Sequence, residues 1–295
     1  MKKITLNNLF LSLLALAVLP CTLNAEPVLH QTWETAAELK LPESVIYDET
    51  NNVLYVSNMQ DDPFKKDGNG FISKVDLSGN ILELKWVTGL NAPKGFAISK
   101  DKLYVADVDQ LVEIDIKPGK VSKYYDAVGA TLLNDVAADS KGNIYVSDTF
   151  TDTIYRLNKF GQLTTWLYTP ELQAPNGLHI ENDQLIVGSW GLPTDGWAAD
   201  VVGHLKSVSL KTKEIKSIGN GSPVGNIDGL KNDGNGDYFV TDWVAGKLLQ
   251  VQRDGSFNVL LELTQGTADF ELIHAKKMII IPMMLEGKLL AFEIN

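Results

Sequence analysis

Cysteine is nearly absent from the sequence, since the one copy in 295 residues is Cys21, near the N-terminus. A chain that loses this segment on export would carry no thiol, which excludes disulfides, thiolate metal sites and a cysteine nucleophile. A large exported protein without disulfides is more typical of a bacterial periplasm than of a eukaryotic secretory route. The scarcity of cysteine therefore removes three classes of site at once.

Basic charge and long apolar runs are also scarce. The formal net charge is −11, from 26 basic and 37 acidic side chains, and no basic patch stands out. A protein of this charge repels nucleic acid and anionic lipid, so we expect no nucleic-acid partner. No apolar run is long enough to span a bilayer, so we expect no membrane insertion.

The first 25 residues have the pattern of a secretory signal peptide. Lys2 and Lys3 form a basic start, an apolar run extends from Leu9 to Leu19, and Leu23-Asn24-Ala25 offers a cleavage site before Glu26. The pattern predicts a periplasmic or secreted protein whose mature chain covers residues 26–295. Without Lys2 and Lys3, its net charge would be near −13, with 24 basic side chains against 37 acidic ones.

The rest of the sequence contains six copies of one unit: a short polar opening, an apolar strand, a turn and a second strand. The openings are "LPESVIYD" at Leu41, "APKGFAIS" at Ala92, "LLNDVAAD" at Leu132, "APNGLHIE" at Ala174, "NIDGLKND" at Asn226 and "TADFELIH" at Thr267. Two units contain a long connection, Met59 to Gly70 in the first and Gly191 to Gly203 in the fourth. Without these connections the unit is about 40 residues, and its strands are rich in β-branched and aromatic residues. Units of this kind are typical of propeller blades.

We therefore predict an all-β fold, a single six-bladed β-propeller with four-stranded antiparallel blades. The sixth unit stops at Asn295 after its third strand, so its outer strand must come from elsewhere in the chain. The spare segment is Val28 to Glu34. Its pairing with the last blade would join the two ends of the domain and remove an exposed sheet edge.

The third residue of each opening is called here the marker of its blade. The markers are Glu43, Lys94, Asn134, Asn176, Asp228 and Asp269. Because the first strand of each blade lines the propeller axis, we expect the markers to meet at one end of the central channel. Gly95, Gly177 and Gly229 follow three markers, which indicates crowding near the axis. The ends of the second strands should ring the markers: Asn58, Asp107, Asp148, Trp190, Asp242 and Met283.

Carboxylate and amide oxygens dominate the marker set, without thiolates or a histidine cluster. Carboxylates held close together are costly unless a positive charge lies among them. Such a set suits a hard divalent cation, calcium before magnesium or manganese. The alternative is that these side chains cap strands or plug the channel through hydrogen bonds and water.

Lys94 complicates the metal hypothesis because it places a cation among the markers. Its ammonium group could replace the ion, point away along the channel, or hold an anionic group of a substrate. A histidine-based mechanism is not expected, because none of His30, His179, His204 and His274 is a marker.

The order and spacing of these motifs resemble the regucalcin–gluconolactonase (senescence marker protein) family, and more distantly the diisopropyl fluorophosphatase and paraoxonase group. The resemblance implies a six-bladed propeller with one calcium-type ion on its axis. By resemblance, Glu43 in "LPES", Asn176 in "APNGL" and Asp228 in "IDGL" hold the metal, and Asn134 in "LLND" contacts the metal or the substrate. Asp269 stands where the phosphotriesterase relatives have a histidine.

The resulting functional hypothesis is a metal-dependent hydrolase that acts on a lactone or related ester. The cation would polarise the carbonyl group, Asp228 would orient or deprotonate the attacking water, and Asn134 would position the substrate. The other residues expected to contact the substrate are Lys94, Asp148, Trp190 and Trp243. The alternative is a non-catalytic propeller that binds a small ligand or a protein partner in the cell envelope, and the fold alone does not separate the two.

Overall fold

A computed structural model describes residues 27–195 and 197–295 of the chain. Residues 1–25, interpreted above as a signal peptide, lie outside the described residues. The regular structure is almost entirely β-strand, with three short 3-10 helices, η1 (Pro170–Leu172), η2 (His274–Lys276) and η3 (Met284–Glu286). No helix in the described part of the chain is both long and apolar enough to cross a membrane.

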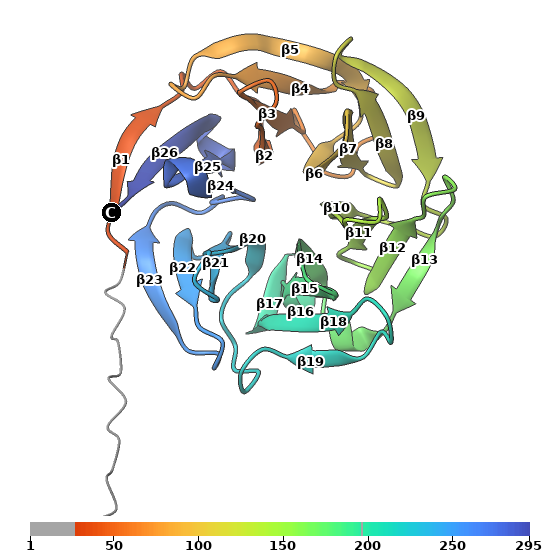
Figure 1. The fold of residues 1–295 in the computed structure, drawn as a ribbon, viewed down its shortest axis with the longest axis vertical. Helices are drawn as coiled ribbons and strands as arrows, with labels where there is room; N and C mark the ends of the chain where they lie inside the picture. The colour runs from red at the N-terminus through yellow and green to blue at the C-terminus, as the bar shows by residue number, and fades with distance from the viewer. Residues whose placement is uncertain (1–26, 196) are drawn as a thin grey trace, which may run out of the picture.

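Six four-stranded antiparallel sheets stand around a ring, as Figure 1 shows. Blade 1 contains β2 (Pro42–Asp48), β3 (Val53–Asn58), β4 (Gly70–Val75) and β5 (Ile81–Leu90), and blade 2 contains β6 (Pro93–Ser99), β7 (Lys102–Asp107), β8 (Gln110–Asp115) and β9 (Lys120–Asp126). Blade 3 contains β10 (Leu133–Ala138), β11 (Ile144–Asp148), β12 (Thr153–Leu157) and β13 (Leu163–Tyr168). Blade 4 contains β14 (Pro175–Glu181), β15 (Gln184–Ser189), β18 (Leu205–Ser209) and β19 (Ile215–Ser217). Blade 5 contains β20 (Ile227–Asn232), β21 (Tyr238–Asp242), β22 (Lys247–Val251) and β23 (Phe257–Glu262). The predicted six-bladed propeller is confirmed.

Blade 6 is closed by the N-terminal strand, as the sequence predicts. It contains β24 (Glu271–Ile273), β25 (Met278–Met283), β26 (Lys288–Ile294) and, on its outer side, β1 (Leu29–Glu34). Leu29 lies opposite Ile294, and the backbones of Val28 and Asn295 also exchange hydrogen bonds. Figure 1 shows the C-terminus beside β1, so the two ends of the domain meet in one sheet.

A chain that begins at Lys40 is expected to lose cooperative unfolding and to aggregate, because it lacks β1 and exposes the outer edge of β26. Thermal unfolding and size-exclusion chromatography would measure this, with a chain that begins at Pro27 as the control. A Lys40 chain as monomeric and as stable as the Pro27 chain would contradict the role given to β1.

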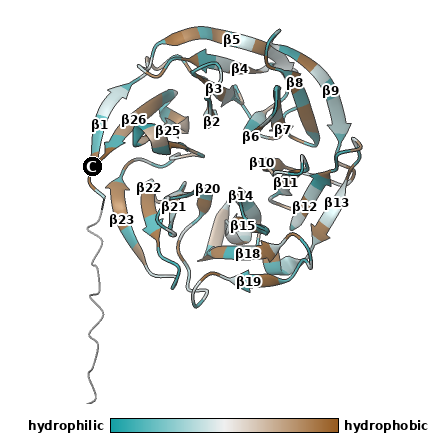
Figure 2. Ribbon diagram, in the orientation of Figure 1, coloured by the Kyte–Doolittle hydropathy of each residue, from teal (hydrophilic) through white to brown (hydrophobic). Residues whose placement is uncertain are grey.

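The core lies between the blades rather than along the axis. Six apolar clusters each join two neighbouring blades, for example Tyr55 and Ile72 of blade 1 with Phe96 and Leu103 of blade 2. The hydropathy colours of Figure 2 change along the strands, as expected where one side of a strand is buried. Because the apolar side chains pack between the blades, polar side chains can line the channel.

Candidate active site

The marker side chains are aimed at the axis by an irregularity that recurs in the inner strands. In β2, β6, β10, β14 and β20 the pairing with the next strand shifts its register across the marker and the residue after it. A β-bulge of this kind sets two residues against one and redirects a side chain. Five of the six markers, Glu43, Lys94, Asn134, Asn176 and Asp228, lie at these shifts.

The glycines that follow three of the markers lie where the inner strands are crowded, as expected. A Cβ atom on Gly95 would overlap the Asp135 carboxylate of the neighbouring blade. One on Gly177 would overlap the backbone oxygen of Asp228, and one on Gly229 would lie 2.8 Å from Cδ1 of Phe270. The inner strands therefore approach one another too closely for side chains at these positions.

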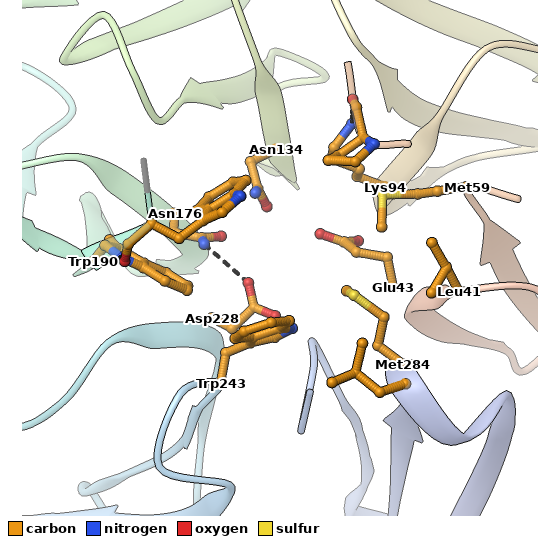
Figure 3. A pocket seen from close by; sticks show the side chains of 13 residues that line it. Leu41, Glu43, Met59, Lys94, Asn134, Asn176, Trp190, Asp228, Trp243 and Met284 are labelled. Carbon is orange, nitrogen blue, oxygen red and sulfur yellow. Dashed lines mark hydrogen bonds between the residues drawn. The ribbon is translucent and has the colours of Figure 1, made fainter. Parts of the chain in front are cut away.

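Four markers come together at one end of the channel, around a cavity of about 210 Å³ (Figure 3). Glu43, Asn134, Asn176 and Asp228 all line it, and at most 5% of any one of them is exposed. Asn176 donates from Nδ2 to Oδ1 of Asp228 over 2.9 Å. The asparagine between a proline and a glycine in "APNGL" thus faces a carboxylate from the next blade.

Three oxygen atoms in this cavity are buried and accept no hydrogen bond from the described chain. They are Oε2 of Glu43, Oδ1 of Asn176 and Oδ2 of Asp228. A buried acceptor without a partner is costly, and a cation among the three would satisfy all of them. The unpaired oxygens belong to the three residues that the family resemblance gives as metal ligands.

The chemistry of this donor set fits a hard divalent cation. It offers carboxylate and amide oxygens, which calcium and magnesium prefer. The described residues contain no cluster of three or more His, Cys, Asp or Glu that could hold a metal ion, so amide oxygens would have to complete the set that Glu43 and Asp228 begin. Asn134 lines the same cavity and could add a fourth donor.

Burial makes negative charge at this site unfavourable when no cation is present. The pKa of Glu43 is raised well above its usual value, first by burial and then by repulsion from Asp228. The pKa of Asp228 is raised in the same way, by burial and then by Asp269, while the hydrogen bond from Asn176 lowers it. Both shifts show that the cavity needs a positive charge if both groups are to be ionised.

Lys94 lies in the cavity wall but does not pair with these carboxylates. Its ammonium group donates to the backbone oxygens of Pro63, at 3.0 Å, and Ala92, at 2.9 Å. Burial lowers its pKa to about 8, although Glu43 acts in the opposite direction. The geometry is that of a lysine turned aside, and it leaves the three oxygens unpaired.

Aliphatic, aromatic and methionine side chains form the other walls of the cavity. The cavity is lined there by Leu41, Met59, Pro63, Trp190, Trp197, Trp243, Met284 and Leu285. Trp197 belongs to the long connection of blade 4, which forms a hairpin of β16 (Gly191–Asp195) and β17 (Ala198–Val202). The structure therefore places this connection at the cavity, and Trp190 and Trp243, both expected to contact substrate, also line it.

Asp148 does not line the cavity, contrary to the expectation that it binds substrate. Its carboxylate accepts hydrogen bonds from the backbone N–H groups of Thr131, at 2.7 Å, and Leu132, at 3.3 Å. Asp107, at the same position of blade 2, accepts from the amides of Asn91 and Ala92. These aspartates at the ends of second strands fix the loop that leads into their own blade, which is a structural role.

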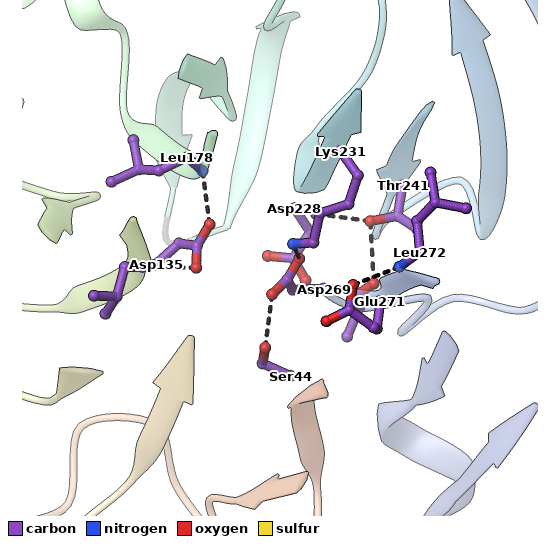
Figure 4. Close-up of polar contacts among 12 residues, drawn as sticks. Ser44, Asp135, Leu178, Asp228, Lys231, Thr241, Asp269, Glu271 and Leu272 are labelled. Atoms are coloured by element: carbon purple, nitrogen blue, oxygen red, sulfur yellow. Dashed lines mark hydrogen bonds and ion pairs between the residues drawn. The ribbon is translucent and has the colours of Figure 1, made fainter. Parts of the chain in front are cut away.

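A second set of polar side chains lies along the inner strands, where Lys231 and Asp269 line a separate cavity (Figure 4). Asp269 accepts from Nζ of Lys231 over 3.0 Å and from the hydroxyl of Ser44 over 2.6 Å. Asp135 accepts from the backbone N–H groups of Leu178 and Val136. Asp269, expected among the converging markers, thus lines a different cavity from Asp228.

Lys231 is the residue of this group that sequence reasoning missed. Burial acts to lower its pKa, but Asp269 and Asp135 outweigh burial and raise the pKa above its usual value. A signal was present in the sequence, since Lys231 stands three residues after a marker. The corresponding residues of the other blades are Ile46, Ala97, Ala137, His179 and Leu272. Only blades 4 and 5 have a polar side chain there.

Comparison with known proteins gives one family and a set of related folds. Residues 41–265 match the profile of the SMP-30/Gluconolactonase/LRE-like region. No curated protein sequence matches the chain.

Among solved structures, a gluconolactonase from Xanthomonas campestris superposes with a TM-score of 0.64 at 15% identity, over 88% of each chain. A streptogramin B lyase superposes with a TM-score of 0.63 at 14% identity, over 91% of this chain and 98% of the other. Virginiamycin B lyase from Staphylococcus aureus gives 0.63 at 12% identity, over 91% of this chain and 99% of its own. At these sequence identities the similarity shows a shared fold and nothing more.

Proposed function

Because the chain belongs to the SMP-30/gluconolactonase/LRE-like family, we propose that it is an exported, metal-dependent hydrolase that opens a lactone or related ester. One observation carries the proposal: three buried oxygens, on Glu43, Asn176 and Asp228, face one cavity without a hydrogen-bond donor. A structural plug would be expected to satisfy its own buried acceptors. These three are left for a ligand.

Glu43, Asn176 and Asp228 would hold the cation, and Asn134 would complete the protein ligands or contact the substrate. Calcium suits this oxygen set best, with magnesium and manganese as alternatives. A divalent cation in this place supplies Lewis-acid stabilisation of the negative charge that develops on the carbonyl oxygen.

Side chains of the protein would transfer the proton and bind the substrate. Asp228 would take a proton from the attacking water, whose oxygen bonds to the carbonyl carbon, and return it to the ring oxygen as the ring C–O bond breaks. Lys94 uses two of its three N–H donors on backbone oxygens, so one remains for a substrate oxygen. Trp190 and Trp243 would pack against the substrate.

Replacement of Glu43 with glutamine tests the proposal. We expect the wild-type protein to hold about one equivalent of calcium. Glu43→Gln should lose most of this calcium and about 10²-fold or more in lactone hydrolysis. Metal analysis of the purified mature protein and a pH-stat assay give the two measurements.

Glu271→Gln is the control, because Glu271 is a half-buried glutamate that accepts from the backbone N–H groups of Tyr47 and Leu272 and does not line the cavity. It should keep both metal and hydrolysis. A wild-type protein that binds no divalent cation would refute the metal-dependent reaction and favour a non-catalytic binding propeller in the cell envelope.

A further inference from the structure

From the walls of the same cavity we infer that the substrate carries an apolar substituent, a short alkyl chain or an aromatic ring, beside its lactone or ester group. The inference rests on the proposed function for the reaction. The preference for an apolar substituent is a property of the walls, and it can be measured with or without turnover. A polyhydroxylated sugar lactone is the substrate that the walls disfavour.

The polar and apolar residues of the cavity are segregated. All polar side chains of the cavity belong to five of the six markers, and every other lining residue is aliphatic, aromatic or methionine. Figure 3 shows Trp190, Trp243 and Met284 around the group formed by Glu43 and Asp228. A lactone carbonyl directed at the markers would therefore leave the rest of the molecule against apolar surface.

The apolar surface continues from the cavity to the outside. Phe64, Phe150 and Trp197 stand together, with ring centroids 5.8 Å apart for Phe64 and Phe150 and 5.1 Å apart for Phe150 and Trp197. Phe64 is 42% exposed, and Leu285, which lines the cavity, is 56% exposed. These four side chains, called here the apolar rim, come from blades 1, 3, 4 and 6 and reach the cavity through Trp197 and Leu285, which line it. Exposed apolar surface gathered at a cavity is typical of a binding site.

Among the apolar side chains of these walls, only the tryptophan N–H groups could donate a hydrogen bond to a hydroxyl group of a substrate. The indole N–H of Trp190 already donates to the backbone oxygen of Trp197 over 3.0 Å, and Lys94 is largely engaged. A hydroxyl group buried without a partner weakens binding by about 10-fold to 10²-fold. Several hydroxyls on one ring would multiply that loss.

A series of lactones tests the inference. We expect kcat/KM to rise by about fourfold for each methylene added from γ-butyrolactone to γ-octalactone, the value for one buried methylene. D-Glucono-δ-lactone should be hydrolysed at least about 10-fold less efficiently than γ-octalactone. A sugar lactone preferred over every alkyl lactone would overturn the inference while leaving the proposed hydrolase intact.

Trp197→Ala should reduce the preference for γ-octalactone over γ-butyrolactone by about 10-fold. The change removes the side chain that both lines the cavity and contacts Phe64 and Phe150. Leu192→Ala is the matched control. Leu192 lies on the same hairpin and is 45% exposed, but it does not line the cavity. An unchanged preference in Trp197→Ala, or an equal loss in Leu192→Ala, would overturn the inference.

Binding of unreactive lactams separates the pocket from the reaction. By calorimetry, a γ-lactam with a butyl substituent should bind at least about 10²-fold more tightly than unsubstituted pyrrolidinone. This result without hydrolysis of any lactone would support the apolar pocket and defeat the proposed reaction. Failure of the butyl lactam to bind more tightly than pyrrolidinone would overturn the inference whether or not lactones are hydrolysed.

Discussion

Lys231→Met is expected to lower the free energy of unfolding by about 3 kcal/mol, the lower end of the range for breaking a buried ion pair, because the side chain of Asp269 is 6% exposed but that of Lys231 is 22% exposed. Lys231 donates to Asp269 over 3.0 Å, and its charge also offsets Asp135 and Glu271. Methionine fills a similar volume but leaves these buried carboxylates without a cation. Chemical denaturation monitored by tryptophan fluorescence measures the loss.

Lys206→Met is the matched control, because Lys206 is a buried lysine whose hydrogen-bond partners are neutral. Its ammonium group donates to Oε1 of Gln173 and to the hydroxyl of Ser189, and burial lowers its pKa to about 8. Its replacement leaves no unpaired charge and should cost about 1 kcal/mol. Equal losses in the two variants would show that Lys231 acts by packing alone. Adding Asp269→Asn to Lys231→Met should restore part of the lost stability, since it removes one stranded charge.

The fold could be predicted from the sequence because each blade repeats the same physical solution. Alternating strands and turn residues recur in six units, and the missing strand of the last unit predicts Val28 to Glu34 as the closing segment, which contains β1 (Leu29–Glu34). Local pattern and overall topology therefore agree in this chain.

Convergence of the markers could be predicted for the same reason, whereas their partners could not. Glu43, Asn176 and Asp228 meet because equivalent positions of a ring point to one axis. The alternatives for Lys94 depended on the rotamer of a long side chain, which the repeat does not specify. The backbone oxygens of Pro63 and Ala92 decide its direction, and Pro63 lies in a connection between strands.

Asp148 and Lys231 show where prediction from the sequence fails: Asp148 was predicted to contact the substrate and does not line the cavity, whereas Lys231 was not predicted to face the channel. Asp148 ends a second strand close to the axis, but the loop of Thr131 and Leu132 folds back and uses its carboxylate. Lys231 lies along an inner strand, where the shift of register at the marker changes which residues face the channel. Alternation along a regular strand cannot anticipate a bulge, so the second set of polar side chains was not foreseen.

Asp228→Asn is expected to lower kcat/KM by about 10³-fold or more, because it removes a metal ligand's charge and the acceptor of the water proton at once. Asparagine at this position can still accept from Nδ2 of Asn176, the contact that Asp228 makes over 2.9 Å, so the local fold should persist. In the metal-free protein the same change should raise the free energy of unfolding by about 1 kcal/mol, since it removes a buried carboxylate that has no cation beside it and one oxygen without a hydrogen bond. Loss of activity with gain of stability is the result expected of a functional residue.

Asp148→Asn is the control for this prediction, because Asp148 is an equally buried aspartate whose carboxylate accepts backbone N–H groups. An asparagine there keeps one acceptor and loses the charge that strengthens both hydrogen bonds, so it should lower stability by about 1–3 kcal/mol and leave turnover per folded molecule unchanged. The two variants thus change activity and stability in opposite patterns. Unfolding curves with and without calcium, together with lactone kinetics at saturating calcium, measure both patterns. If Asp228→Asn kept full turnover, or if Asp148→Asn lost turnover while remaining folded, the division between ligand-binding markers and structural aspartates would be wrong.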